Sequence, residues 1–332
     1  MEQKKIREDI ARNELKSLYL LFGEERFLVS HYSKAIEESV KKSYGLEFCK
    51  DVFEGAVSVG EIIMTAETLP FIGGKRLIFV KDSKLFQSGR KSDSELMAEY
   101  LPRIPEETIM VFIESEVDRR VRLFKQFSAH GRVEDCKPQT AGAIQKWVKR
   151  IANEKGKTMS DSTAYALINT CGHNMTSLFQ EVQKLIHYTG QNKEINEIDI
   201  KAVATPTMES RIFELTKAMG AGRVSDALKL YGNMLYLKES PIMILTMIIR
   251  QLRLILLCKC AEEKKFTRAQ MEKELGIRDF VVSEVLSHAA RFSKKRLLSA
   301  LFECQETDVK IKTGLIAPEI GVEILLIILA SP

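Results

Sequence analysis

The sequence predicts an α/β domain with a parallel sheet, followed by two helical domains. Short apolar runs alternate with amphipathic segments from residue 17 to 136, which is typical of parallel strands joined by helices. Within this region Leu18–Phe22 has the pattern of a buried strand that runs through a turn at Gly23 into a helix. After Pro138 strand signals almost cease and helical spacing takes over. We therefore predict domains at residues 1–138, 139–206 and 207–332.

Five strands are predicted in the first domain, and amphipathic helices connect them. The predicted strands are Ser17–Phe22, Phe48–Glu54, Arg76–Val80, Thr108–Glu114 and Arg132–Cys136. Apolar residues at helical spacing indicate two of the connecting helices, one from Phe27 to Val40 and one from Val59 to Ala66. A sheet of this kind is covered on both faces, and it binds ligands at the edge where its strands end.

The rest of the chain predicts helices. The first three are Ala143–Asn153, Asp161–Thr170 and Met175–Tyr188, and a short fourth helix follows Asn196. Thr205-Pro206-Thr207 interrupts the pattern, and helices continue from Glu209 to the C-terminus. No repeat of fixed length occurs, so the pattern does not favour a solenoid.

The composition is that of a globular, cytoplasmic protein. Hydrophobic residues make up 45% of the 332 residues and charged residues 29%, and no uninterrupted apolar run reaches the roughly 20 residues that cross a bilayer. The charged N-terminus is not followed by a hydrophobic signal core. The cysteines form no C-x-x-C pair and no zinc-type spacing, so we expect reduced and mostly buried thiols. A net charge of +5 permits a nucleic-acid partner without requiring one.

The turn after the first strand has the position of a nucleotide-binding loop but not its chemistry. A P-loop has the pattern G-x-x-x-x-G-K-[ST], in which backbone amides and the lysine hold the phosphates and the hydroxyl holds magnesium. This chain has Gly23, followed by Glu24 and Glu25, whose carboxylates would repel a triphosphate at the start of the helix. We therefore predict a degenerate loop that binds no nucleotide, and no other cofactor is indicated.

Other candidate motifs lack their required partners. Gly156-Lys157-Thr158 resembles the end of a P-loop, but Ile151 stands where the first glycine belongs, so we interpret the tripeptide as an interhelical turn. Gly73-Gly74-Lys75 fails in the same way, because Leu69 precedes it at that spacing. The histidines are scattered without metal-binding spacing, and no serine or cysteine nucleophile motif occurs. We predict no catalytic residue and no metal site.

Two further segments point to partners. Arg119, Arg120 and Arg122 form a basic helix start that could contact nucleic acid or phosphate, although a solvated helix face explains the same charge pattern. Leu69-Pro70-Phe71-Ile72 places large apolar residues on a short connection between a helix and a strand. Such residues suggest insertion into a partner's pocket, but a plug that faces the protein's own core fits equally well.

Together these segments resemble the delta subunit of the bacterial DNA polymerase III clamp loader. The resemblance lies in the order and spacing of motifs along nearly the whole chain, and no single motif is diagnostic. The motifs are Tyr19–Glu25 with Phe27-Leu28, Leu69-Pro70-Phe71 with Lys75–Ile78, Asp118-Arg119-Arg120 with Leu123-Phe124-Lys125, Trp147, Leu178–Leu185 and Glu306–Gly314. The resemblance implies an AAA+-like (RecA-type) N-terminal module, a small helical lid domain and an all-α collar domain.

The resemblance also implies a function. Delta subunits of this family do not hydrolyse ATP, and they bind and open the ring-shaped sliding clamp, the beta subunit, with a hydrophobic wedge. The wedge corresponds here to Leu69 and Phe71 with Pro70 between them, whereas relatives have two adjacent apolar residues. The collar is implied to join delta to ATPase subunits of the gamma/tau type and to a delta-prime-type subunit, around primed DNA.

Two other functions remain open from the residues alone. A loop at Glu24 and Glu25 that still bound nucleotide through its amides would indicate a divergent AAA+-type ATPase. A DNA-binding adaptor that used Arg119, Arg120 and Arg122 would bind duplex tightly, in a salt-sensitive way and without a partner.

Overall fold

The computed structural model describes residues 2–12, 14–44, 49–70, 74–277, 279–289 and 291–331. The chain forms two compact units, Met1–Gln139 and Thr140–Pro332, which are described separately. The boundary that the sequence predicts at 206/207 lies inside the second unit, and the division into three domains stays a prediction.

The first unit contains a five-stranded sheet in which every pair of neighbouring strands is parallel. Its order is β2-β3-β4-β1-β5, so β1 lies between β4 and β5. The strands are β1 (Leu18–Phe22), β2 (Cys49–Glu54), β3 (Arg76–Lys81), β4 (Thr108–Glu114) and β5 (Arg132–Asp135). The five predicted strands are thus confirmed to within one or two residues. All five residues of β1 are buried, as expected for a strand covered on both faces.

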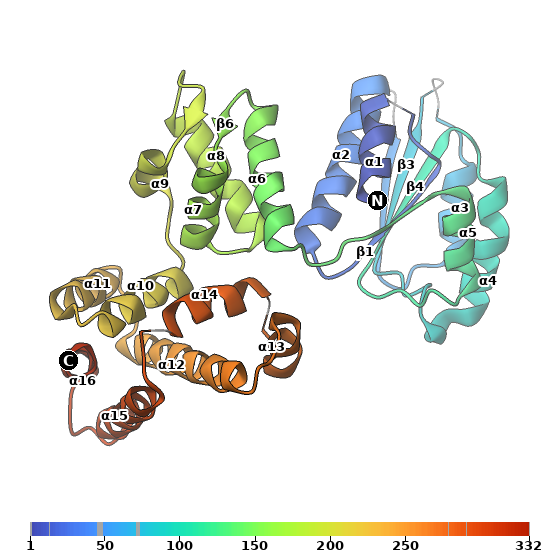
Figure 1. Cartoon of the computed structure of the whole chain (residues 1–332). Coiled ribbons are helices and arrows are strands. Elements are labelled where there is room, and N and C mark those ends of the chain that lie inside the picture. The colour runs from blue at the N-terminus through green and yellow to red at the C-terminus, as the bar shows by residue number, and fades with distance from the viewer. Residues whose placement is uncertain are drawn as a thin grey trace. The chain divides into compact units, whose positions relative to one another are not determined.

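Helices cover both faces of this sheet (Figure 1). The helices α1 (Glu2–Arg12) and α2 (Arg26–Tyr44) lie on one face, and α3 (Val59–Glu67), α4 (Lys91–Tyr100) and α5 (Arg122–His130) lie on the other. An aromatic cluster forms part of the core on the α3–α5 side, where the ring centroid of Phe112 lies 5.7 Å from that of Phe86 and 5.1 Å from that of Phe127.

The sequence patterns did not predict α1. This helix is strongly polar, and among its described side chains Ile6 and Asp9 are buried. Arg132 of β5 donates to both carboxylate oxygens of Asp9, at 2.8 and 3.0 Å, and Tyr19 donates to the same carboxylate at 3.4 Å. The helix is therefore held by a tertiary polar contact in addition to the burial of Ile6.

The second unit is helical apart from one short pair of strands. Its first helices are α6 (Ala141–Glu154), α7 (Asp161–Cys171), α8 (Met175–Tyr188) and α9 (Glu197–Val203), which confirms the four predicted there. Among the residues that the structure describes, seven more follow: α10 (Met208–Gly220), α11 (Val224–Tyr236), α12 (Pro241–Glu263), α13 (Arg268–Leu275), α14 (Asp279–Ala289), α15 (Lys294–Lys312) and α16 (Pro318–Ala330). The strands β6 (Thr158–Met159) and β7 (Glu194–Ile195) pair in parallel, and they are too short to leave a strand pattern in the sequence.

Helix α12 is long and apolar enough to cross a membrane by length and composition alone. Its residues Ile244, Ile248, Leu252 and Ile255 are nevertheless buried in a hydrophobic core that α12 shares with α10, α11 and α14–α16. The helix also contacts α10, α14, α15 and α16 directly. We therefore regard α12 as the central core helix of this part of the chain.

Candidate functional site

The two segments of greatest interest in the first unit lie at opposite edges of its sheet. The turn at Gly23 follows β1, so it lies at the edge where the parallel strands end. Leu69 and Pro70 follow α3, whose end is bonded to Arg76 at the start of β3, so these two residues lie at the edge where the strands begin. The loop without P-loop chemistry and Leu69 are thus separated by the length of the strands.

The Gly23–Glu25 turn is packed against the end of β5. The amide of Cys136 donates to the carbonyl of Phe22 at 2.6 Å, and the amide of Glu25 donates to the carbonyl of Cys136 at 2.8 Å. Gly23 has a φ of +119°, and a Cβ at this position would lie 2.5 Å from the carbonyl oxygen of Cys136. Only glycine fits this turn without strain.

The amides at the start of α2 are already used within the chain. Besides the Glu25 amide, the amide of Arg26 donates to the carbonyl of Glu24 at 3.0 Å, and the amide of Phe27 donates to the carboxylate of Glu25 at 3.4 Å. In a P-loop the corresponding amides hold phosphate. Here the backbone and an acidic side chain occupy them.

Arg26 and Arg119 pair with groups of the protein at this edge. The guanidinium of Arg26 donates to the hydroxyl of Ser115 at 2.8 Å, and this hydroxyl donates to Asp82 at 2.5 Å. Arg119 forms an ion pair with Asp135 and lies over the ring of Phe22, 5.7 Å from its centroid. The contacts join residues far apart in the sequence, so no local pattern could have indicated them.

We expect the isolated protein not to bind ATP. The loop offers no phosphate-reaching lysine, its amides are occupied, and Glu24 and Glu25 place negative charge at the helix start. Equilibrium dialysis with labelled ATP measures this directly. Micromolar binding that disappears when Glu24 or Glu25 is replaced by lysine would show that the loop is a working site.

The other two arginines of the basic segment also have acidic partners. Arg120 donates to both carboxylate oxygens of Asp118, and this hydrogen bonding lowers the pKa of Asp118 to about 2. Arg122 lies 3.2 Å from Glu95 and 3.4 Å from Glu99. Helix α5 begins only at Arg122, so Arg119 and Arg120 precede it instead of forming its start. Contact of the three arginines with nucleic acid stays a prediction.

The end of α3 is fixed by three side chains from other elements. Thr108 donates from its hydroxyl to the carbonyl of Ala66 at 2.9 Å, and Tyr100 donates to the carboxylate of Glu67 at 2.7 Å. Arg76 donates from Nε to the carbonyl of Thr68 at 2.7 Å. Burial raises the pKa of Tyr100, which keeps its hydroxyl protonated as a donor. The chain therefore leaves α3 from a fixed point.

Leu69 follows this fixed point, and its side chain is 61% exposed. It is therefore not a plug of the protein's own core, which was one of the two interpretations of this segment. Pro70 is half-buried. Phe71 and Ile72 lie outside the described residues.

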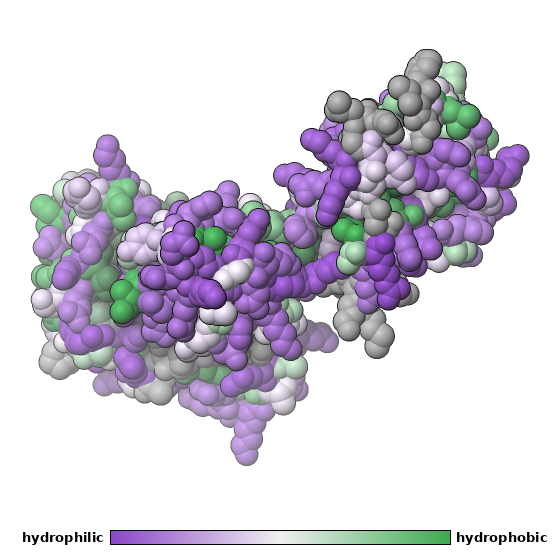
Figure 2. Space-filling model, turned by 90° about the horizontal axis from the view of Figure 1, so that it is seen from above, coloured by the Kyte–Doolittle hydropathy of each residue, from purple (hydrophilic) through white to green (hydrophobic). Residues whose placement is uncertain are grey.

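Exposure alone does not make Leu69 a binding residue. On the face in view in Figure 2, hydrophobic residues occur in small groups among hydrophilic ones, and the protein has many exposed apolar side chains. What distinguishes Leu69 is its position directly after the end of α3, which three tertiary hydrogen bonds hold in place. The backbone that leads into Leu69 therefore loses little conformational freedom when the side chain binds.

The segment Gly156-Lys157-Thr158, which resembles the end of a P-loop, has a structural role. Lys157 is buried, and its ammonium group donates to the carbonyls of Gly190 and Asn192 at 2.7 and 2.5 Å. It therefore fastens the turn before β6 to the turn before β7. The tripeptide lies between α6 and α7, as interpreted from the sequence, but its Thr158 begins the short strand β6. Among the described residues, no group of three His, Cys, Asp or Glu side chains is placed to hold a metal ion.

Comparison with known proteins gives consistent results over both units. A family model described as "DNA polymerase III, delta subunit" matches residues 19–137, and one described as "DNA polymerase III delta subunit, C-terminal domain" matches residues 209–329. Together they cover more than half of the chain.

Individual relatives agree with these matches. The DNA polymerase III subunit delta of Bacillus subtilis is 26% identical over 314 residues, which cover 92% of this chain and 90% of that protein. The probable DNA polymerase III subunit delta of Aquifex aeolicus is 22% identical over 304 residues, which cover 88% and 85%. The solved structure of the Bacillus subtilis DNA clamp loader delta protein matches with a TM-score of 0.73 and 25% identity, over 98% of this chain and 99% of that one.

Proposed function

This chain belongs to the DNA polymerase III delta subunit family, and we propose that it binds and opens the sliding clamp during replication without hydrolysing ATP itself. The observation that carries the proposal is Leu69, an exposed apolar side chain directly after the fixed end of α3. The resemblance to the family's wedge supports Phe71 as its neighbour in the contact.

The physical basis of the contact is burial of apolar surface. Two large apolar side chains that enter a pocket contribute about 1.5 to 3 kcal/mol each before ordering costs are subtracted. The hydrogen bonds at Ala66, Glu67 and Thr68 reduce the ordering cost, because they fix the chain on one side of the segment before binding.

Clamp opening needs no nucleotide in this subunit. A ligand that binds the open ring better than the closed ring shifts the equilibrium by the difference in its affinities. ATP in neighbouring subunits then needs only to control access to the wedge. The loop at Gly23–Glu25, whose amides are bonded within the chain, agrees with a role for nucleotide in the neighbouring subunits alone.

The proposed partners are those of a bacterial clamp loader in the cytoplasm. The collar, residues 207–332, would bind ATPase subunits of the gamma/tau type and a delta-prime-type subunit, and the assembly would enclose primed DNA. Exposed apolar side chains on α12, α15 and α16 support a role in association; they include Leu257, Leu298, Phe302, Ile324 and Ile328. The bonded loop amides argue against a divergent ATPase. The three arginines pair with carboxylates but stay at least half exposed, so an independent DNA-binding adaptor is tested by duplex binding without a partner.

A fragment of residues 1–140 tests the proposal. We expect it to retain clamp binding, because the first unit has its own core and carries Leu69, but not to join the loader, because it lacks the collar. Capture on the organism's own sliding clamp and size-exclusion chromatography with the ATPase subunits measure the two properties. Co-elution of the fragment with those subunits as a stable complex would show that the collar is misassigned, and failure to bind the clamp would contradict the wedge.

A further inference from the structure

The inference concerns the connector, residues 204–207, which joins α9 to α10. Its backbone is extended, with ψ values of 137° at Ala204 and 162° at Thr207, yet all its N–H groups are bonded. Ala204 donates to the carbonyl of Ile200 at 2.8 Å, Thr205 to the carboxylate of Glu181 at 3.2 Å, and Thr207 to the carbonyl of Thr170 at 3.0 Å. Pro206 has no N–H group. Each acceptor lies in α7, α8 or α9.

Glu181 and Lys184 of α8 hold the middle of the connector together. The ammonium group of Lys184 lies 2.7 Å from Glu181 Oε2, the same oxygen that accepts from the amide of Thr205. It also donates to the hydroxyl of Thr205 at 3.0 Å and to the carbonyl of Val203 at 3.4 Å. Glu181 is mostly buried, so solvent screens its carboxylate poorly, whereas the ammonium group of Lys184 stays partly exposed.

Thr207 connects the connector to α10. Its hydroxyl accepts from the amide of Ser210 at 3.2 Å and so caps the start of α10, while its own amide is bonded to the end of α7. A Cβ at Gly172, where φ is +76°, would lie 3.4 Å from the methyl carbon of Thr207. Helix α10 thus begins at a residue that is fixed to α7.

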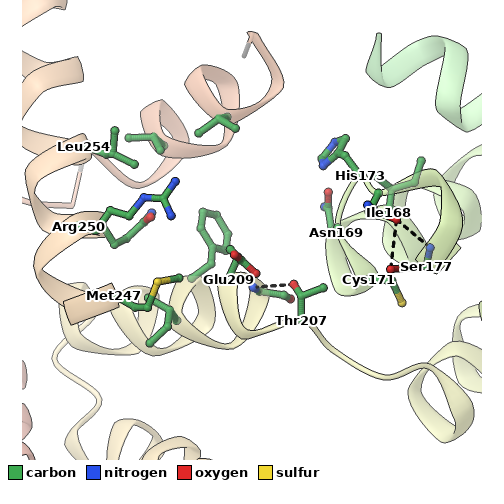
Figure 3. Close-up of a pocket in the computed structure, with 18 residues that line it drawn as sticks. Ile168, Asn169, Cys171, His173, Ser177, Thr207, Glu209, Met247, Arg250 and Leu254 are labelled. Carbon is green, nitrogen blue, oxygen red and sulfur yellow. Dashed lines mark hydrogen bonds between the residues drawn. The ribbon is translucent and has the colours of Figure 1, made fainter. Parts of the chain in front are cut away.

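Beside Thr207, the space between α7 and α12 is not filled by apolar side chains. A cavity of about 360 Å³ lies beside Thr207, and its walls come from both sides of the connector (Figure 3). Ile168, Asn169 and His173 line it from α7 and the turn after α7, and Met247, Arg250 and Leu254 line it from α12. Because side chains do not fill this space, the contacts of the connector contribute to setting the direction in which α10 leaves α7.

We propose that Glu181 and Lys184 are positioning residues that fasten the connector to α8 and so fix the direction in which α10 leaves the helices before it. Without this pair, the amide of Thr205 loses its acceptor, and the connector keeps only the bonds of Ala204 to Ile200 and of Thr207 to Thr170. The proposal goes beyond clamp binding, because it concerns only contacts within the second unit.

Hydrogen–deuterium exchange of the full-length chain tests the proposal. Removing the acceptor with Glu181→Leu, or the cation with Lys184→Met, is expected to speed exchange at the amide of Thr205 about tenfold or more, as expected for one lost charge-assisted bond. Exchange at Thr207 is expected to rise by a smaller factor, because its bond to the carbonyl of Thr170 is kept. Glu181→Gln keeps an acceptor oxygen and is expected to restore most of the protection at Thr205. Lys146→Met, an exposed lysine of α6, is the matched control and is expected to change neither amide.

Two outcomes would overturn the proposal. One is unchanged exchange at Thr205 and Thr207 in both Glu181→Leu and Lys184→Met. The other is exchange that rises equally throughout α7 and α8, which would assign the pair to the stability of those helices instead of to the connector.

Discussion

Replacing Leu69 and Phe71 together by alanine is expected to weaken binding to the sliding clamp by roughly 3 to 6 kcal/mol, the range for two truncated hot-spot residues. Truncation of Leu69 is expected to change the free energy of unfolding little, because its side chain is 61% exposed and its removal leaves no cavity in the core. Clamp affinity and the melting temperature, measured on the same preparation, provide both readouts.

Leu96→Ala is the matched control. Leu96 is an exposed leucine of the same unit, 48% accessible, but it lies on α4 and not on the segment after α3. We expect this variant to bind the clamp normally. Unchanged clamp affinity of the double variant, or an equal loss in Leu96→Ala, would contradict the wedge.

The second large effect is expected at Gly23. Gly23→Ala forces a side chain into a backbone conformation that only glycine adopts readily, at about 1 to 3 kcal/mol. It also brings Cβ to 2.5 Å from the carbonyl oxygen of Cys136, which adds about 1 to 3 kcal/mol of overpacking. We expect the melting temperature of the first unit to fall by about 10 °C.

Two other glycines separate the cost of the backbone conformation from the cost of overpacking. Gly55 also has a positive φ, +78°, but a Cβ there meets nothing within 4 Å, so Gly55→Ala is expected to show the cost of the backbone conformation alone. Gly89 has open space around it and no positive φ, so Gly89→Ala is expected to be close to neutral. Equal losses in Gly23→Ala and Gly55→Ala would show that the approach to Cys136 is unimportant.

The sequence predicted the strands well because the burial of a parallel strand leaves a direct signal. Leu18–Phe22 and Thr108–Glu114 are nearly continuous apolar runs, and both are buried strands in the structure. Helix α1 has no comparable stripe, and its attachment depends on Asp9 and Arg132, which are distant in sequence. A pattern read over a short window cannot detect such a pair.

The same limit applies to the sites. The absence of a second glycine and a lysine was enough to predict that the loop at Gly23 is degenerate. The hydrogen bond from the amide of Glu25 to the carbonyl of Cys136 could not be predicted in this way. It depends on the sheet order, which brings the end of β5 beside β1. Likewise, the charge pattern identified Arg119, but its pairing with Asp135 depends on the fold.

The placement of the two segments at opposite edges of the sheet has an evolutionary consequence. The strands have four to seven residues, which separates the edges by about 15 to 20 Å. A substitution in the turn after β1 therefore does not touch Thr108, Tyr100 or Arg76, which fix the end of α3. A lineage with this architecture can lose nucleotide chemistry at one edge by drift while selection acts on recognition at the other.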